Sequence, residues 1–477
     1  MKPISGVLFV LSLAGASAPV FAIGAEPAQA ALPDRVPAAL VDFFTGRWSG
    51  AGEFASGKKI EADVSFRLEL EGQWLQYRHT DRAPNRYQAL GMWGVDNVSH
   101  QLIMSVTDNF GGARVFGSGG WDGNSVSFVR TEAGRSERFV FERQSENSFK
   151  MRYEVRSGEQ PWRLGDYLVF TRVPDPAAGA VASLAAPLPF APGVISGPEH
   201  DAAPAFSADG RTLWFSRSDG GASTILESRY DNGQWSAPRT AGFSGRWRDM
   251  EPAMAPGGDY LVFISNRPVA ADGKPLDGDF GGKHYAEGGG NLWRVERRGD
   301  GWGEPVHLPA IVNASSSTFA PSVARDGSLY FMHPSEDSGK FRLYRAQYRD
   351  GAYLAPVALP FSTGASTDVD PAVAPDESFI VFGSGRSPAR GMDLFIAFRR
   401  CGEWGRPLHL GGRVNSAGSD AEPRLGIDGR TLYFSSERLA EDATGAAWNN
   451  GKYNIWQVAL TPLLEASPPR ACGSAEE

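Results

Sequence analysis

Cysteine is scarce in this sequence, which contains only two cysteines in 477 residues, Cys401 and Cys472. Two isolated sulfurs without a cluster of histidines do not supply the ligands of a zinc site, so no metal site is predicted. In an oxidising compartment the two could form one disulfide, closing a loop of 71 residues (472 − 401). The alternative is two unrelated thiols, one of them in a C-terminal tail.

Basic residues are in the minority, because 47 Lys and Arg stand against 55 Asp and Glu, a net charge of −8. No basic cluster is present, which argues against nucleic acid or an anionic membrane as partner. Beyond the N-terminus no apolar run is long enough to cross a bilayer, so membrane insertion is not expected. The sequence also lacks a nucleophile elbow, a phosphate loop and a zinc motif, so no catalytic residue and no cofactor is predicted.

The N-terminus does contain an apolar run, "MKPISGVLFVLSLAGASAPVFA", which follows a single lysine and ends in small residues. Val20 and Ala22 stand where a signal peptidase requires small side chains, so residues 1–22 are predicted to be a secretory signal peptide. No cysteine lies near this site, which argues against a lipoprotein. Residues 23–35 are expected to be the flexible N-terminal tail of an exported protein, periplasmic or secreted.

A repeat of about fifty residues dominates the C-terminal part of the chain. Five segments share a proline, a turn and an alternating apolar run, and the first is "DAAPAFSADGRTLWFSRSD". The repeat prolines are Pro204, Pro252, Pro321, Pro371 and Pro423. An Asp-Gly turn between two short apolar runs predicts a hairpin, because Asp and Gly tolerate positive φ. A third alternating run and a proline-containing outer segment complete four strands, and such units repeated radially make a β-propeller.

Five units predict an all-β propeller, five-bladed, over residues 183–462, with a degenerate sixth blade as the alternative. Only four units have an outer strand, and residues 183–190 resemble the missing one. These residues would complete the last blade, closing the ring and removing its exposed edges. The repeats resemble the WD40-like repeats of TolB-type propellers, which implies a binding platform rather than a particular reaction. Residues 463–477 are expected to form a C-terminal tail.

Residues 36–173 have a different pattern, in which apolar and polar residues alternate over many short segments. In "IEADVSFRLEL", for example, Ile60, Val64 and Phe66 share one face, which is typical of a half-buried antiparallel strand. About nine such strands joined by short turns predict an up-and-down β-barrel. Residues 174–182, "PDPAAGAVA", are the predicted linker.

The segments "FFTGRWSGAGEF", "LEGQWLQYR", "GMWGVD" and "VTDNFGG" resemble a bacterial domain of unknown function in the calycin superfamily, related to lipocalins and nitrobindin. The resemblance implies a barrel that can hold a small apolar ligand. Nitrobindin-like members can hold haem through a histidine near the C-terminal strand, but this chain has none there, so haem binding is not expected. His79 alternates in phase with Leu75 and Tyr77 and could point inward, either as a hydrogen-bonded histidine at the barrel mouth or as a ligand.

Carboxylates recur three residues and one residue before the repeat proline, and arginines end the second strand beside them. The candidate ligand-binding residues are Asp249, Glu251, Asp368, Asp370, Asp420, Glu422, Arg267, Arg386, Arg438 and Trp448. Arginine–carboxylate pairs that hold strand ends together are one interpretation, and Glu422 is expected to pair with Arg438. A charged funnel for a ligand or a peptide is the other.

Two insertions break the symmetry of the repeats, at residues 268–290 and 439–453, and long loops on a rigid scaffold often carry function. The first is acidic but lacks the spacing of a calcium-binding loop. The second contains Trp448, whose ring would suit a sugar. Solvated loops are the alternative interpretation of both insertions.

These patterns predict an exported, non-catalytic binding protein. Its propeller would dock a protein or another envelope component, and its barrel would hold a small apolar ligand. The alternative is a carbohydrate-binding protein or a glycoside hydrolase that uses the channel carboxylates, because paired carboxylates hydrolyse glycosides. Carboxylates without an arginine partner would favour the enzyme.

Overall fold

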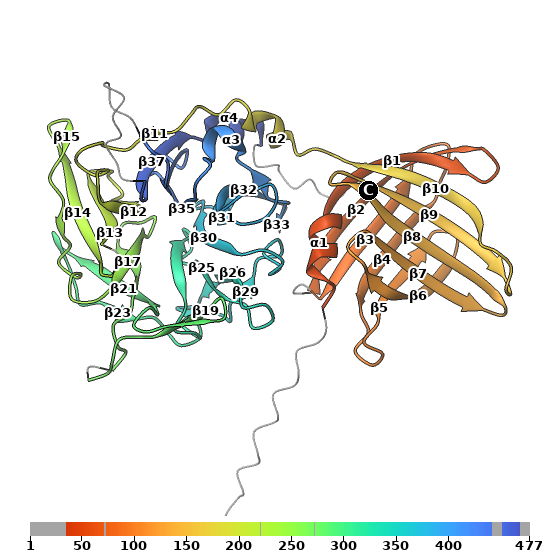
Figure 1. The fold of residues 1–477 in the computed structure, drawn as a ribbon, viewed down its shortest axis with the longest axis horizontal. Coiled ribbons are helices and arrows are strands. Elements are labelled where there is room, and N and C mark those ends of the chain that lie inside the picture. Colours follow the sequence, from red (N-terminus) through yellow and green to blue (C-terminus); the bar gives the residue numbers. More distant parts are fainter. Residues whose placement is uncertain (1–34, 71–72, 220, 271, 441–450, 468–477) are drawn as a thin grey trace, which may run out of the picture.

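The computed structural model describes residues 35–70, 73–219, 221–270, 272–440 and 451–467. An N-terminal closed barrel is followed by a five-bladed propeller (Figure 1), so the predicted all-β class and blade number are confirmed. No helix in these ranges is long and apolar enough to span a membrane. The predicted signal peptide, residues 1–22, lies outside the described residues.

The barrel has ten antiparallel strands, because the Gly-x-Trp segment forms a first strand in addition to the nine alternating segments. Its elements are α1 (Ala38–Phe44), β1 (Gly46–Phe54), β2 (Lys59–Glu69), β3 (Trp74–Asp81), β4 (Gln88–Val95), β5 (Leu102–Asp108), β6 (Gly112–Trp121), β7 (Ser125–Glu132), β8 (Arg135–Ser145), β9 (Ser148–Ser157) and β10 (Arg163–Arg172). Each strand pairs with its neighbour in the chain, and β1 pairs with β10 to close the barrel.

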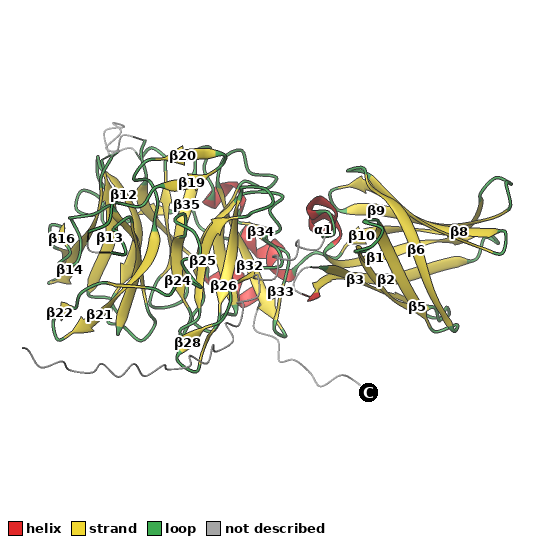
Figure 2. Ribbon diagram, turned by 90° about the horizontal axis from the view of Figure 1, so that it is seen from below, coloured by secondary structure: helices red, strands yellow, loops and turns green. Residues whose placement is uncertain are grey.

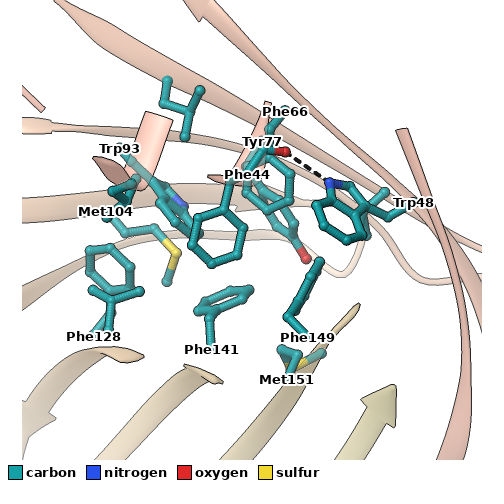
Figure 3. Packing of buried hydrophobic residues seen from close by; sticks show 14 of the residues in the cluster. Phe44, Trp48, Phe66, Tyr77, Trp93, Met104, Phe128, Phe141, Phe149 and Met151 are labelled. Atoms are coloured by element: carbon teal, nitrogen blue, oxygen red, sulfur yellow. Dashed lines mark hydrogen bonds between the residues drawn. The ribbon is translucent and has the colours of Figure 1, made fainter. Parts of the chain in front are cut away.

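One end of the barrel is filled by aromatic side chains around α1. Phe44, which is fully buried, packs edge-on against Trp93 and Phe149, with ring centroids 5.2 and 5.3 Å apart (Figure 3). The indole Nε1 of Trp48 donates to the carbonyl of Phe44 at 2.8 Å. Because α1 precedes β1, this core occupies the barrel end where β1 begins, and Figure 2 shows that end nearest the propeller.

The propeller blades are regular in their three inner strands. Blade 1 comprises β12 (His200–Phe206), β13 (Thr212–Ser218), β14 (Ser223–Asp231), β15 (Gln234–Trp235) and β16 (Arg239–Thr240); blade 2 comprises β17 (Asp249–Met254), β18 (Tyr260–Ser265), β21 (Asn291–Arg298), β22 (Gly301–Trp302) and β23 (Val306–His307). Blade 3 comprises β24 (Phe319–Val323), β25 (Leu329–Pro334), β26 (Phe341–Ala346), β27 (Tyr348–Arg349), β28 (Ala352–Tyr353) and β29 (Val357–Ala358). Blade 4 comprises β30 (Asp368–Val373), β31 (Phe379–Ser384), β32 (Asp393–Arg400), β33 (Glu403–Trp404) and β34 (Leu408–His409). Blade 5 comprises β35 (Asp420–Leu425), β36 (Thr431–Ser436), β37 (Asn454–Ala459) and β11 (Leu188–Pro189).

The closing strand was correctly predicted, since β11 pairs with β37 and gives the last blade its outer strand. The outer edge of blades 1, 2 and 4 differs from the single strand expected, because two short pieces both pair with the third strand. A proline lies between those pieces, and proline cannot donate to a strand ladder. The first insertion forms a small hairpin of β19 (Gly278–Phe280) and β20 (Lys283–Tyr285).

The predicted linker, residues 174–182, contains the short helix α2 (Pro176–Val181). Asp175 caps this helix by accepting from the backbone N–H of Ala177, and it pairs with Arg400 of the propeller at 2.9 Å. Ala177 is fully buried in the apolar cluster that also contains Leu463 of α4 (Thr461–Ala466). The segment therefore packs on the propeller instead of running free. Helix α3 (Gly411–Val414) completes the helices.

Candidate functional site

Four blades end their second strand near an arginine that pairs with an aspartate at the start of the first strand. The pairs are Asp201–Arg217 (2.6 Å), Asp249–Arg267 (2.7 Å), Asp368–Arg386 (2.7 Å) and Asp420–Arg438 (2.9 Å), each from a carboxylate oxygen to a guanidinium nitrogen. The four aspartate side chains are at most 1% exposed. These ion pairs are buried and recur in four blades, so they hold strand ends together. This agrees with the first interpretation of the sequence.

Blade 3 lacks this pair. Its first strand follows Thr318, whose hydroxyl donates to the carbonyl of Ser315 at 2.9 Å. Its second strand contains His333, whose ring stacks on that of Tyr344 with the centroids 3.8 Å apart. Two separate contacts of these side chains thus stand where the other blades have one ion pair.

The expected pair of Glu422 with Arg438 is wrong, because Arg438 pairs with Asp420. Glu422 has a backbone φ of 48°, which turns its side chain away from the strand end, and its Oε2 accepts from the hydroxyl of Ser435 at 2.8 Å. The carboxylate instead lies near those of Glu251 and Asp370, which come from two other blades. The propeller therefore contains an outer, paired set of carboxylates and an inner set of three.

The inner carboxylates share a backbone conformation that every blade adopts. Each first strand has a β-bulge, and the residue before the repeat proline is left-handed: Ala203 (φ 49°), Glu251 (51°), Ala320 (54°), Asp370 (55°) and Glu422 (48°). Such a conformation costs about 1–3 kcal/mol in a non-glycine residue and often marks functional sites. Because two of the five residues are alanines, the strain here belongs to the repeat and does not by itself indicate a site.

Electrostatics distinguish the inner set from the outer pairs. Burial raises the pKa of Glu251, Asp370 and Glu422, that of Glu422 to about 7, and the charge of Asp370 raises the pKa of the other two further. Arg424 opposes the rise in all three. None of the ion pairs found among the described residues involves these three carboxylates, so Arg424 is a shared neighbour and not a direct partner.

Glu251 is the least satisfied of the three. Asp370 accepts from the backbone N–H of Glu422 at 3.1 Å, and Glu422 accepts from Ser435. Glu251 is 8% exposed, and its Oε2 has no hydrogen-bond partner in the described part of the chain. The Nη2 atom of Arg424, which is 5% exposed, is likewise without a partner there.

Two further candidate residues cannot be placed. Trp448 and Cys472 lie outside the described residues. Cys401 is exposed at the turn after β32. The disulfide and the role of Trp448 therefore remain predictions.

The largest described cavity, about 1050 Å³, lies in the barrel, at the end opposite α1 where β1 finishes. An eight-stranded barrel is about wide enough for side chains to fill, and ten strands enclose more space. The aromatic core around Phe44 occupies only the end beside α1, so the other end stays hollow. Among its lining residues are Tyr77, His79 and Asp81 from β3 and Asp166 from β10.

Three side chains on the inner face of β3 form a hydrogen-bonded chain. His79, 2% exposed, lies between the hydroxyl of Tyr77 (2.7 Å to Nδ1) and the carboxylate of Asp81 (2.8 Å to Nε2). A carboxylate only accepts, so Nε2 donates to Asp81; in the tautomer with a single proton on Nε2, Nδ1 accepts from the tyrosine. His79 is thus the hydrogen-bonded barrel histidine that the alternation indicated, and it faces the cavity.

Asp166 differs from the other acidic residues of the cavity in the surroundings of its carboxylate. It shares the inward phase of β10 with Leu168 and Phe170, which are buried, and its carboxylate has no hydrogen bond or ion pair among the described residues. Burial, and then the neighbouring charge of Asp81, raises its pKa to about 7. An acid whose charged form is this costly points to a functional position.

In the described ranges no group of three or more His, Cys, Asp or Glu side chains is arranged to hold a metal ion. His284 of the first insertion contacts Asp279 at 2.9 Å and Asp277 at 3.8 Å, and these exposed side chains are not arranged to hold an ion.

Asp81, Asp166 and Arg424 were not among the residues predicted from the sequence, although each is marked by a signal in it. Asp81 and Asp166 are charged residues in the inward phase of otherwise apolar strands. Arg424 follows its repeat proline where the other blades have Ala205, Ala253, Ser322 and Ala372. At all three positions a charged residue stands where the pattern requires a small or apolar one.

No model of a known protein family matches the chain, and no curated protein matches it. Similar solved structures include TolB from Acinetobacter baumannii, 14% identical over 77% of this chain and 67% of that one, with a TM-score of 0.28. Others are Rv2717c from M. tuberculosis (15%, 30% and 100%, TM-score 0.23) and a thermostable family-43 glycoside hydrolase (9%, 56% and 90%, TM-score 0.36). Similarity at this level concerns the fold alone, and no functional residue is transferred from these proteins.

Proposed function

We propose that this chain is an exported binding protein whose barrel holds a small, partly apolar organic molecule. The observation that carries the proposal is the cavity of about 1050 Å³ at the open end of the barrel. Ligand sites are concave and mainly apolar, with a few polar groups that fix orientation. Tyr77, His79 and Asp81 supply such groups, held by one another in a fixed chain, beside the apolar side chains of Met151 and Leu168.

The cavity can be tested with a neutral, environment-sensitive dye such as Nile red. Met151→Trp places a large ring in the cavity, whereas Met92→Trp places it on the outward phase of β4, between the buried Gly91 and Trp93. We expect saturable binding by the native protein, at least about tenfold weaker in Met151→Trp and unchanged in Met92→Trp. Equal binding by both variants, each shown to be folded by its melt, would contradict a ligand site in the barrel.

The propeller is proposed to dock an envelope protein or a glycan. Its support is a closed ring of five blades with buried ion pairs at one end of four of them, and a first insertion that forms the β19–β20 hairpin. Export rests on the predicted signal peptide of residues 1–22, and mass spectrometry of the mature N-terminus tests it: cleavage after Ala22 is expected, and an intact Met1 in the native host would contradict it.

Glycan hydrolysis or binding in the propeller channel is the second candidate function. The observation that favours it is the inner set of carboxylates, which form no ion pair with an arginine among the described residues, and above all Oε2 of Glu251, which has no hydrogen-bond partner there. Against it, none of the three carboxylates lines the propeller pocket that contains Arg424. Hydrolysis of a panel of nitrophenyl glycosides tests it: Glu251→Gln should abolish any activity and the exposed Glu304→Gln should not, whereas an inactive native protein would count against the enzyme.

A further inference from the structure

The basic side chains that line the barrel cavity are either paired with carboxylates or exposed at its rim. Lys58 and Arg86 are exposed at its rim. Arg114 pairs with Asp108 and, at 3.2 Å, with Glu137. An anionic ligand would therefore bring its charge to a cavity whose guanidinium group is already neutralised.

Among the described residues, not every carboxylate that lines the cavity has a hydrogen-bond or ion-pair partner. Asp108 forms an ion pair with Arg114, and Asp81 accepts a hydrogen bond from Nε2 of His79. Asp166 has no such partner, and its charged form is destabilised by burial and by Asp81, which together raise its pKa to about 7. A cation placed beside Asp166 would offset both costs, because an opposite charge within a few ångströms favours the ionised form of a carboxylate.

The walls around this carboxylate are aromatic. Tyr87 packs edge-on against His79, with centroids 5.3 Å apart, and stacks on Phe110 at 6.1 Å. Tyr153, paired with Asp166 across the β9–β10 ladder, packs against Phe139 at 4.9 Å. Aromatic faces attract cations as well as apolar groups, and more strongly where water is excluded.

From this arrangement we infer that the ligand of the barrel is an organic cation, an amine with an aromatic or aliphatic body, whose ammonium group lies on Asp166. The inference rests on the proposed function and names the chemical class of its ligand. The hydrocarbon body fills the cavity toward Met151 and Leu168, and the rings of Tyr87 and Tyr153 flank the charge.

Three probes that share one ring system test the inference by calorimetric titration at pH 8, where Asp166 is ionised and an alkylamine is still protonated. They are 2-naphthylmethylamine, 2-naphthylmethanol and 2-naphthoic acid. We expect the amine to bind at least about tenfold more tightly than the alcohol and the acid to bind most weakly. In Asp166→Asn the advantage of the amine should disappear while the alcohol binds as before.

The matched control is Glu61→Gln, which removes an exposed carboxylate from the outer face of β2 in the same barrel and should keep the preference for the amine. Equal binding of amine and alcohol by the native protein would overturn the inference and leave the proposed function standing. A preference that survives in Asp166→Asn would also overturn it. If neither these probes nor Nile red binds, the proposed function fails, and the inference fails with it.

Discussion

Among individual residues, Glu422 has the clearest dependence on pH. Its pKa rises from an ordinary 4.5 to about 7, because of burial first and Asp370 second. A carboxyl group with a raised folded-state pKa stabilises the protein below the unfolded pKa, and that stability is lost as pH rises through the folded pKa. Because glutamine stays neutral, we expect the free energy of unfolding of Glu422→Gln, relative to that of the native protein, to increase by about 2–3 kcal/mol from pH 5 to pH 8.

Denaturant melts at several pH values measure this difference. The exposed Glu304→Gln is the control and should show a difference that does not change across the same window. A Glu422→Gln variant whose stability relative to the native protein is constant from pH 5 to pH 8 would show that Glu422 titrates normally.

The Asp420–Arg438 pair gives a second residue-scale prediction. Asp420→Ala leaves the guanidinium of Arg438 without its carboxylate in a mostly buried position and should cost about 3–5 kcal/mol. Asp420→Ala/Arg438→Ala should cost less than the sum of the two single changes, because contacting residues are coupled. Glu422→Ala/Arg438→Ala should be additive, since those charges do not pair. Urea melts of all variants decide this, and coupling of Glu422 with Arg438 would contradict the pairing described above.

The sequence was informative about the outer pairs and misleading about Glu422 for one physical reason. Spacing along two antiparallel strands correctly brought Asp249 to Arg267 and Asp368 to Arg386. A bulge adds one residue to one strand only, and the left-handed φ at Glu422 then redirects its side chain into the channel. Nothing in the spacing of residues reports a bulge, so the division into outer and inner carboxylates appeared only in three dimensions.

At the scale of elements, the segment that begins with the short strand β11 joins the first and last blades, and one of its buried side chains lies between them. Phe190, which follows β11, is 7% exposed and contacts the rings of Tyr433 in blade 5 and Phe206 in blade 1. Phe190→Ala should cost about 3–5 kcal/mol, because it removes a buried ring from the apolar cluster between the first and last blades, in which Phe206 and Tyr433 still contact each other. Leu188→Ala in β11 itself should cost at most about 0.5 kcal/mol, since Leu188 is 65% exposed. Equal losses in chemical denaturation would place the closure in the β11 backbone instead.

Elements with a strong repeat or a strict alternation were predicted well, and elements that depend on tertiary packing were not. The three inner strands of each blade and the closing strand follow from the pattern. Helices α1 and α2 have seven and six residues, too few to show a helical period or to be stable alone. They exist because Phe44 and Ala177 have apolar clusters to pack on.

At the scale of the whole molecule, the order of a barrel followed by a propeller could be predicted from the sequence, but the cavity in the barrel could not. Alternation indicates which side chains face inward, but the free volume depends on the number of strands and on how far the core around Phe44 extends. The contacts between barrel and propeller were also beyond the pattern. They include hydrogen bonds of Thr363 to Asp42 (3.1 Å) and of Ser387 to Glu146 (3.4 Å), and an ion pair of Arg67 with Glu403.

These interdomain contacts are polar, and a cleft of about 530 Å³ lies between α1 and blade 4. Interfaces of this kind couple domains weakly, so we expect calorimetry of the full chain to show two transitions. Val64→Ala in the barrel and Val262→Ala in the propeller are matched changes at buried sites, each costing about 2 kcal/mol. Each should lower one transition by roughly 4–8 °C and leave the other in place. A shift of both transitions by either change would mean that the barrel and the propeller unfold as one unit, and the Arg67–Glu403 ion pair, which joins the barrel to blade 4, would then be the first contact to remove.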